Sequence, residues 1–247
     1  MSVDILDLAA FYATPLGQYV QQQLTASMRD MWPTPAQAAD ETVIGYGFGT
    51  PLFADLWPHA QWRFLMPSQI GVMLENDQLD GRIAMAEEAC LPLRESSVNR
   101  LIGVHGVEVA RDVEALFHEF WRVLVPQGRV LLVVPNRSGF WARGDSTPFG
   151  MGRPFSRGQL RAIMQQTGFD KIHFRAGLLM PPFLPVRLMH SLAAIEGLSR
   201  YISPQVNGVW LVEAVKRVPA PLKQQKRVRL PVAGLPRPAF SQNLPRR

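Results

Sequence analysis

The sequence predicts a doubly wound α/β domain over residues 40–217, with helices on both faces of a mostly parallel sheet. Short apolar stretches of strand length alternate there with amphipathic helical stretches. Residues 129–134 are almost all apolar, as in a strand buried on both faces. A glycine loop, Gly45-Tyr46-Gly47-Phe48-Gly49, follows the first predicted strand, at the edge where open α/β sheets bind ligands.

A helical extension is expected at residues 1–35. Apolar residues recur at helical spacing as far as residue 31, with a break near Thr14-Pro15-Leu16-Gly17. The prolines of Trp32-Pro33-Thr34-Pro35 end the helical pattern. The α/β domain is then assigned to residues 36–217.

Strand patterns within this domain fall at residues 41–45, 62–65, 81–86, 98–104, 129–134, 171–176 and 209–215. Asp112 can cap a helix whose buried stripe is Val113, Leu116, Phe117, Phe120 and Leu124. The turn Pro126-Gln127-Gly128 follows. Ser156 and Gln159 form a capping-box pattern for a second helix, which Gly168 ends.

The charge of +6 is concentrated at the C-terminus. Residues 218–247 hold seven Lys/Arg, six prolines and no Asp/Glu, and they are predicted to be disordered. This tail could contact nucleic acid or an anionic membrane surface, or serve only for solubility. Phe240 is its single aromatic residue, so base stacking and a nucleic-acid partner are not expected.

A cytoplasmic location is the simplest interpretation of the chain. The sequence has no apolar run long enough to span a membrane and no signal-peptide pattern at its start. The single cysteine, Cys90, rules out an internal disulfide framework. It has no adjacent His or basic group, so we expect a buried structural thiol rather than a nucleophile.

The glycine loop can hold a ligand or can simply form a tight turn between strand and helix. A dinucleotide-binding fingerprint fits poorly, because Thr50 stands where the third glycine belongs. That fingerprint also needs an acid about 20 residues further on. The strand there ends in Leu65-Met66-Pro67-Ser68, with no acid.

Four segments together resemble the class I S-adenosylmethionine-dependent methyltransferases, in particular their small-molecule "type 11" group. They are Val43-Ile44-Gly45-Tyr46-Gly47-Phe48-Gly49, Glu87-Glu88-Ala89-Cys90-Leu91-Pro92-Leu93, Val98-Asn99-Arg100-Leu101-Ile102-Gly103-Val104-His105 and Phe120-Trp121-Arg122-Val123-Leu124-Val125-Pro126-Gln127-Gly128-Arg129-Val130-Leu131. Further stretches, Phe11-Tyr12-Ala13-Thr14-Pro15-Leu16-Gly17 and residues 135–143 and 147–156, resemble a bacterial subfamily of these proteins.

This resemblance implies a Rossmann-like, seven-stranded sheet with an antiparallel last strand, and S-adenosylmethionine as cofactor. Its glycines would approach the methionine part of the cofactor, Glu87 would lie near the adenine, and His105 would form the pocket floor. The glycines concerned are Gly45, Gly47 and Gly49. The family has an acid two positions before the first glycine and another at the ribose hydroxyls. Here these positions hold Val43 and Met66.

The resulting functional hypothesis is methyl transfer from S-adenosylmethionine to a small-molecule acceptor. His105 is the candidate base if the acceptor must lose a proton. The alternative is a catalytically silent methyltransferase fold that acts as a binding or regulatory protein, which Val43 and Met66 favour. No metal site is predicted, because His105 and Glu108 have no further ligands nearby in sequence. His118 is expected on a solvated helix face.

The long segment at residues 135–155 is the candidate substrate site. It follows the fifth strand, contains four glycines, and is predicted to form a lid over the pocket. Its polar and aromatic residues could grip an anionic or aromatic substrate. We assign that role to Asn136, Arg137, Trp141, Arg143 and Arg153. The alternative is that the three arginines are solvated or pair with local acids.

Overall fold

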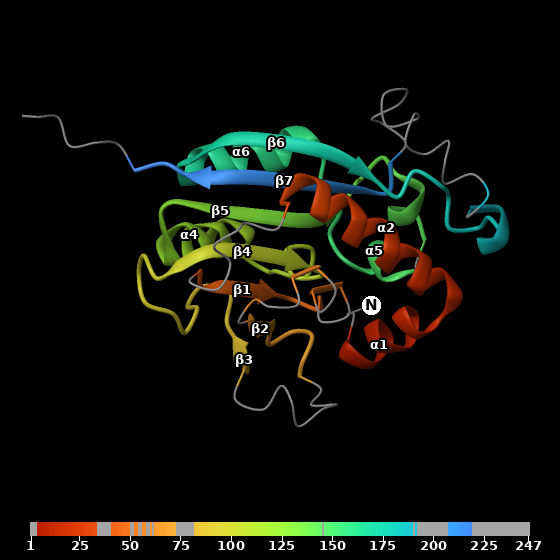
Figure 1. The fold of residues 1–247 in the computed structure, drawn as a ribbon, viewed down its shortest axis with the longest axis horizontal. Coiled ribbons are helices and arrows are strands. Elements are labelled where there is room, and N and C mark those ends of the chain that lie inside the picture. The colour runs from red at the N-terminus through yellow and green to blue at the C-terminus, as the bar shows by residue number, and fades with distance from the viewer. Residues whose placement is uncertain are drawn as a thin grey trace, which may run out of the picture.

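A computed structural model describes residues 4–33, 41–49, 52–53, 56–57, 60, 62–72, 82–144, 146–189, 191 and 207–218 (Figure 1). Its seven strands form one sheet in the order β3-β2-β1-β4-β5-β7-β6. They are β1 (Val43–Tyr46), β2 (Trp62–Pro67), β3 (Ile83–Ala86), β4 (Val98–Val104), β5 (Leu124–Pro135), β6 (Phe169–Gly177) and β7 (Val209–Lys216).

The sheet is parallel from β3 to β5, and β7 runs antiparallel between β5 and β6. The predicted fold class is therefore confirmed, including the antiparallel last strand. Because β6 and β7 are antiparallel to each other, β6 runs in the same direction as β5. The carboxyl ends of β1, β2, β4, β5 and β6 consequently lie at one edge of the sheet, on the right in Figure 1.

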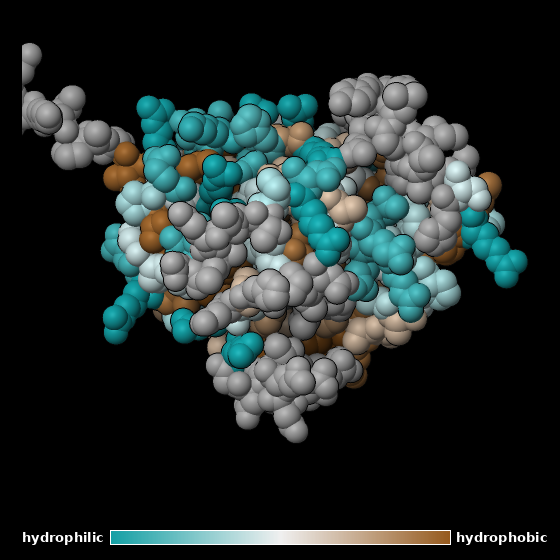
Figure 2. Space-filling model, viewed as in Figure 1, coloured by the Kyte–Doolittle hydropathy of each residue, from teal (hydrophilic) through white to brown (hydrophobic). Residues whose placement is uncertain are grey.

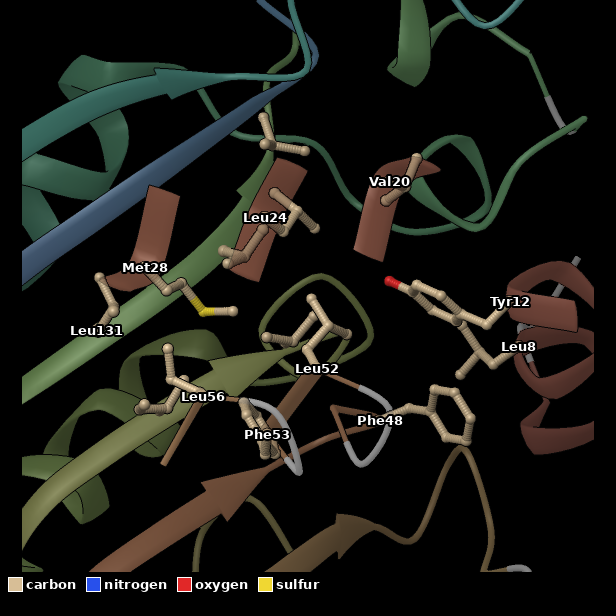
Figure 3. Packing of buried hydrophobic residues seen from close by; sticks show 14 of the residues in the cluster. Leu8, Tyr12, Val20, Leu24, Met28, Phe48, Leu52, Phe53, Leu56 and Leu131 are labelled. Carbon is tan, nitrogen blue, oxygen red and sulfur yellow. The ribbon is translucent and has the colours of Figure 1, made fainter. Parts of the chain in front are cut away.

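Helices cover both faces of the sheet. They are α1 (Ile5–Ala13), α2 (Pro15–Met31), α4 (Val113–Val123), a short 3-10 helix η2 (Phe140–Ala142), α5 (Pro148–Met151) and α6 (Arg157–Thr167). Side chains of α1 and α2 join one apolar cluster with one face of the sheet, and those of α4 and α6 join a second cluster with the other. Figure 3 shows Leu24 and Met28 of α2 packed near Leu131 in the first cluster.

The predicted break in the N-terminal helix is a joint at Thr14. Thr14 ends α1 and caps α2, where its Oγ1 accepts a hydrogen bond from the Gly17 amide at 3.0 Å. A Cβ on Gly17 would lie 2.1 Å from the carbonyl oxygen of Phe11, so the joint closes only with glycine. Residues 34–35 of the predicted stop lie outside the described residues, as do residue 145 of the predicted lid segment and the tail from residue 219.

The predicted helix caps are confirmed. Asp112 Oδ1 accepts from the Ala115 amide at 2.9 Å, Ser156 and Gln159 form the reciprocal capping box, and Gly168 ends α6 with φ of 100°. The turn Pro126-Gln127-Gly128, predicted to precede the fifth strand, lies within β5 instead. The strand already pairs with β4 at Leu124, and the turn bulges out before pairing resumes at Arg129.

No helix among the described residues combines the length and apolar character that a membrane crossing needs.

Candidate functional site

The glycine loop and His105 lie side by side because their strands are neighbours. Gly45 pairs with Ile102 and Tyr46 with Gly103, so β1 and β4 deliver both segments to the same edge. Strand β1 lies between β2 and β4, so the strand that follows β1 in sequence pairs on one side of it and β4 pairs on the other. Such a topological switch point is where open α/β sheets bind ligands.

All three loop glycines are required by packing within the protein. Gly47 has φ of 81°, and a Cβ there would lie 2.2 Å from the carbonyl oxygen of Val104. Cβ atoms on Gly45 and Gly49 would lie 2.8 Å and 2.1 Å from the ring of Phe53. The glycine pattern therefore has a structural cause of its own, besides any ligand that the loop holds.

A chain of three buried polar side chains lies beside the loop. His105 Nε2 is 2.8 Å from the Tyr12 hydroxyl, and His105 Nδ1 is 3.1 Å from Glu108 Oε1. Burial, reinforced by the negative charge of Glu108, raises the pKa of Tyr12, so its hydroxyl keeps its proton. With neutral imidazole, the consistent arrangement has Tyr12 donating to Nε2 and Nδ1–H donating to Glu108.

The segment at residues 135–155 packs against this chain. The ring of Phe149, from α5, lies 4.7 Å from the imidazole of His105. The Glu108 carbonyl accepts from the Arg153 amide at 2.8 Å, and a Cβ on Gly152 would lie 2.7 Å from Glu108 Cγ. The segment thus fixes Glu108 against His105 through its backbone and Phe149, while Glu108 Oε2 has no partner among the described residues.

Tyr12 is the site residue that sequence reasoning missed. It reaches from α1 toward the glycine loop and packs 5.9 Å from the ring of Phe48 (Figure 3). Helical spacing from Leu8 marks Tyr12 as buried, and a buried tyrosine hydroxyl usually needs a hydrogen-bond partner. The partner is 93 positions away, and no local pattern identifies it.

Neither a protein-family model nor a curated protein sequence matches the chain. Solved structures do. A Thermotoga maritima S-adenosylmethionine-dependent methyltransferase, described as a possible histamine N-methyltransferase, superposes with a TM-score of 0.61 at 16% identity, covering 86% of this chain and 96% of its own. A Haloferax volcanii protein solved with the Trm112 methyltransferase activator gives 0.58 at 16% identity, covering 87% and 99%. The [4+2]-cyclase SpnF gives 0.56 at 18% identity, covering 81% and 82%.

The chain has the class I methyltransferase fold. Its sheet order belongs to that architecture, and these identities show the fold alone. The resemblance seen in the sequence is confirmed at this level. The type 11 group and a bacterial source remain predictions.

The residues expected around the cofactor differ in their exposure to solvent. Glu87 is exposed, after β3. Its neighbour Glu88 is buried and structural, since its carboxylate accepts from the Arg111 and Asp112 amides at 2.9 and 2.8 Å. Met66 and Val43 are each 1% exposed within an apolar cluster. Met66, the residue expected at the ribose hydroxyls, is therefore an apolar, buried side chain near the end of β2.

The five residues predicted to grip a substrate are separated into two groups. Asn136 and Trp141 are buried, with Asn136 Nδ2 donating to the Asn207 carbonyl at 2.8 Å and Trp141 Nε1 to the Met180 carbonyl at 2.8 Å. Arg137, Arg143 and Arg153 are exposed. These arginines contact carbonyl oxygens and the rings of Phe140 and Phe155.

Two further predictions concern single residues. His118 is exposed on α4, as expected. Cys90 was predicted to be buried, and this is wrong, because it is exposed. It closes a turn with Glu87, and Leu91 after it takes the buried position. Among the described residues, no group of three or more His, Cys, Asp or Glu is placed to hold a metal ion.

Proposed function

We propose that the protein is an S-adenosylmethionine-dependent methyltransferase that acts on a small-molecule acceptor. The observation that carries this proposal is the junction at the switch point. There the glycine loop lies beside the buried Tyr12–His105–Glu108 chain, in a fold shared with S-adenosylmethionine-dependent enzymes. Buried acid–base groups beside a loop at a topological switch point are candidates for a functional site.

The cofactor would be held by the glycine loop and Glu87. Gly45, Gly47 and Gly49 would face its methionine part, and Glu87 its adenine. When bound, S-adenosylmethionine supplies a methyl group on an activated sulfonium. The thioether of Met66 is at most a weak acceptor for the ribose hydroxyls, so we expect weak affinity for the cofactor. Each missing contact costs about 1–3 kcal/mol.

His105 is proposed as the base that takes a proton from the acceptor. The Tyr12 hydroxyl is hydrogen-bonded to Nε2 of His105. Helix α1 would therefore have to shift before an acceptor could reach this nitrogen. Glu108 on Nδ1 would orient the ring and stabilise the imidazolium that forms. The protein's other contribution would be to align the acceptor and exclude water.

The second candidate is a catalytically silent fold that binds a ligand or partner. The burial of Val43 and Met66 among apolar side chains favours it. A cyclase among the structural neighbours also indicates that this architecture carries chemistry other than methyl transfer.

Calorimetric titration of the full chain with S-adenosylmethionine and S-adenosylhomocysteine separates the two. The enzyme proposal requires binding that Glu87→Gln weakens by about tenfold, as for a lost charged contact. Glu114→Gln, a matched change of an exposed acid on α4, should leave binding unchanged. If neither ligand binds at millimolar concentration, the silent fold is the correct interpretation.

A further inference from the structure

An apolar projection follows β6 at the carboxyl edge of the sheet. Two large hydrophobic side chains of this segment, residues 181–188, face solvent: Phe183 is 71% exposed and Leu188 is 45% exposed. These two exposed hydrophobic side chains fall within six positions of each other.

Several contacts hold this projection in place. The ring of Phe183 packs edge-on against Phe140 of η2 at 5.9 Å. Just before the segment, the Met180 carbonyl accepts from Trp141 Nε1 at 2.8 Å. The amides of Leu188 and Met189 bond to the Pro185 carbonyl at 2.9 and 3.1 Å. Phe183 and Leu188 are therefore presented by an ordered element.

The charged residues of the described segments 136–144 and 177–189 are all arginines. Arg187 is exposed within it, and the exposed guanidinium of Arg143 lies over the Phe140 ring at 5.0 Å. Neither residues 136–144 nor residues 177–189 contain an Asp or Glu. Exposed apolar side chains beside exposed arginines match a surface that is negatively charged outside and apolar beneath.

The projection also lies at the edge that carries the candidate site. β6 ends at the same side of the sheet as β1 and β4, and both α1 and the segment after β6 extend beyond that side (Figure 1). Figure 2 shows hydrophobic and hydrophilic atoms next to each other at this right-hand end of the molecule. A surface docked there would face the edge that bears the glycine loop and His105.

We propose that residues 181–188 dock the protein onto an anionic lipid surface. Phe183 and Leu188 enter the boundary between headgroups and acyl chains, while Arg143 and Arg187 contact lipid phosphates. Leu188 and the three prolines of the segment are aliphatic, and such side chains favour lipid over nucleic acid, whose bases stack on aromatic rings. This docking is independent of methyl transfer and stands whether or not the protein binds S-adenosylmethionine.

Co-sedimentation of the full chain with vesicles tests the proposal. We expect binding to vesicles of phosphatidylcholine with phosphatidylserine, weak binding to phosphatidylcholine alone, and weakening by salt. Phe183→Ser should reduce the partition coefficient by about tenfold, and Arg187→Glu by a similar factor.

Matched controls place the same changes elsewhere. Met85→Ser alters a side chain that is 61% exposed on β3, and Arg94→Glu reverses an exposed charge before β4, at the opposite edge. Both should bind vesicles as the unchanged chain does. The proposal is overturned if the unchanged chain ignores phosphatidylserine vesicles. It is also overturned if the Phe183→Ser and Arg187→Glu variants bind vesicles as the unchanged chain does, because the basic tail would then account for the binding. Binding to oligonucleotides but not to vesicles would overturn it as well.

Discussion

The hydroxyl of Tyr12 and Nε2 of His105 lie 2.8 Å apart, and this contact joins α1 to the end of β4. It is buried, and it places a side chain of the N-terminal helices inside the site at the switch point. A helical extension that resembled an appendage in the sequence is thereby part of the candidate site.

Tyr12→Phe should lower the free energy of unfolding by about 1–2 kcal/mol, because His105 loses a buried partner. Urea denaturation measures this loss. A double-mutant cycle with His105→Asn should give a coupling energy of at least about 0.5 kcal/mol. Asparagine suits this position because residue 105 has φ of 53°. Additive effects would show that the two side chains do not interact.

Gly47→Ala should destabilise the protein by at least about 2 kcal/mol, because it combines an unfavourable φ with a backbone clash. The matched control is Gly158→Ala in α6, where the nearest atom to a new Cβ is Ser156 Oγ at 4.0 Å. That change should be neutral or stabilising. Thermal unfolding compares them, and equal melting temperatures would contradict the packing explanation. Loss of ligand binding in a Gly47 variant would therefore not by itself prove a ligand contact.

Asn136→Ala should cost about 1–3 kcal/mol of stability, because it leaves the buried groups around Asn207 without a partner. Arg137→Ala, one position further on and exposed, should change stability by less than about 0.5 kcal/mol. Denaturant unfolding of both variants decides whether Asn136 is structural. If Asn136→Ala is as stable as Arg137→Ala, the buried amide is free for a substrate role.

Glu119 should make stability dependent on pH in the acid range. Its carboxylate accepts from Arg122 Nε at 2.6 Å and from the Leu91 amide at 2.7 Å, and the bond from Arg122 is the main cause of its lowered pKa. Because the folded pKa is below the ordinary 4.5, the stabilisation is fully present above that value and is lost as pH falls through the folded pKa.

Glu119→Gln should consequently be less stable than the unchanged chain at neutral pH, and the difference should shrink as the pH falls below 4.5. Unfolding free energies measured from pH 7 downward test this trend. Glu114→Gln, on the solvated face of the same helix, should show no comparable convergence. If the unfolding free energies of the Glu119→Gln variant and the unchanged chain differ by the same amount at every pH, the ionic contribution of Glu119 is excluded.

The sequence by itself determined the architecture. Strand and helix patterns, caps and the loop glycines are local signals, because they arise from backbone geometry and from which side of an element is apolar. β4 was placed at its observed bounds, and the capping box of α6 was read directly from Ser156 and Gln159. The break between α1 and α2 at Thr14 was likewise predicted from a local signal, the Thr14-Pro15-Leu16-Gly17 segment.

Only the tertiary structure decided which polar groups meet. Tyr12, His105 and Glu108 come from α1 and from the loop after β4, and burial together with strand order brings them into contact. The same long-range packing buried Asn136 and Trp141 while leaving Arg137 and Arg143 in solvent. The contact between Tyr12 and His105 joins residues 93 positions apart, so residue type and spacing do not reveal it.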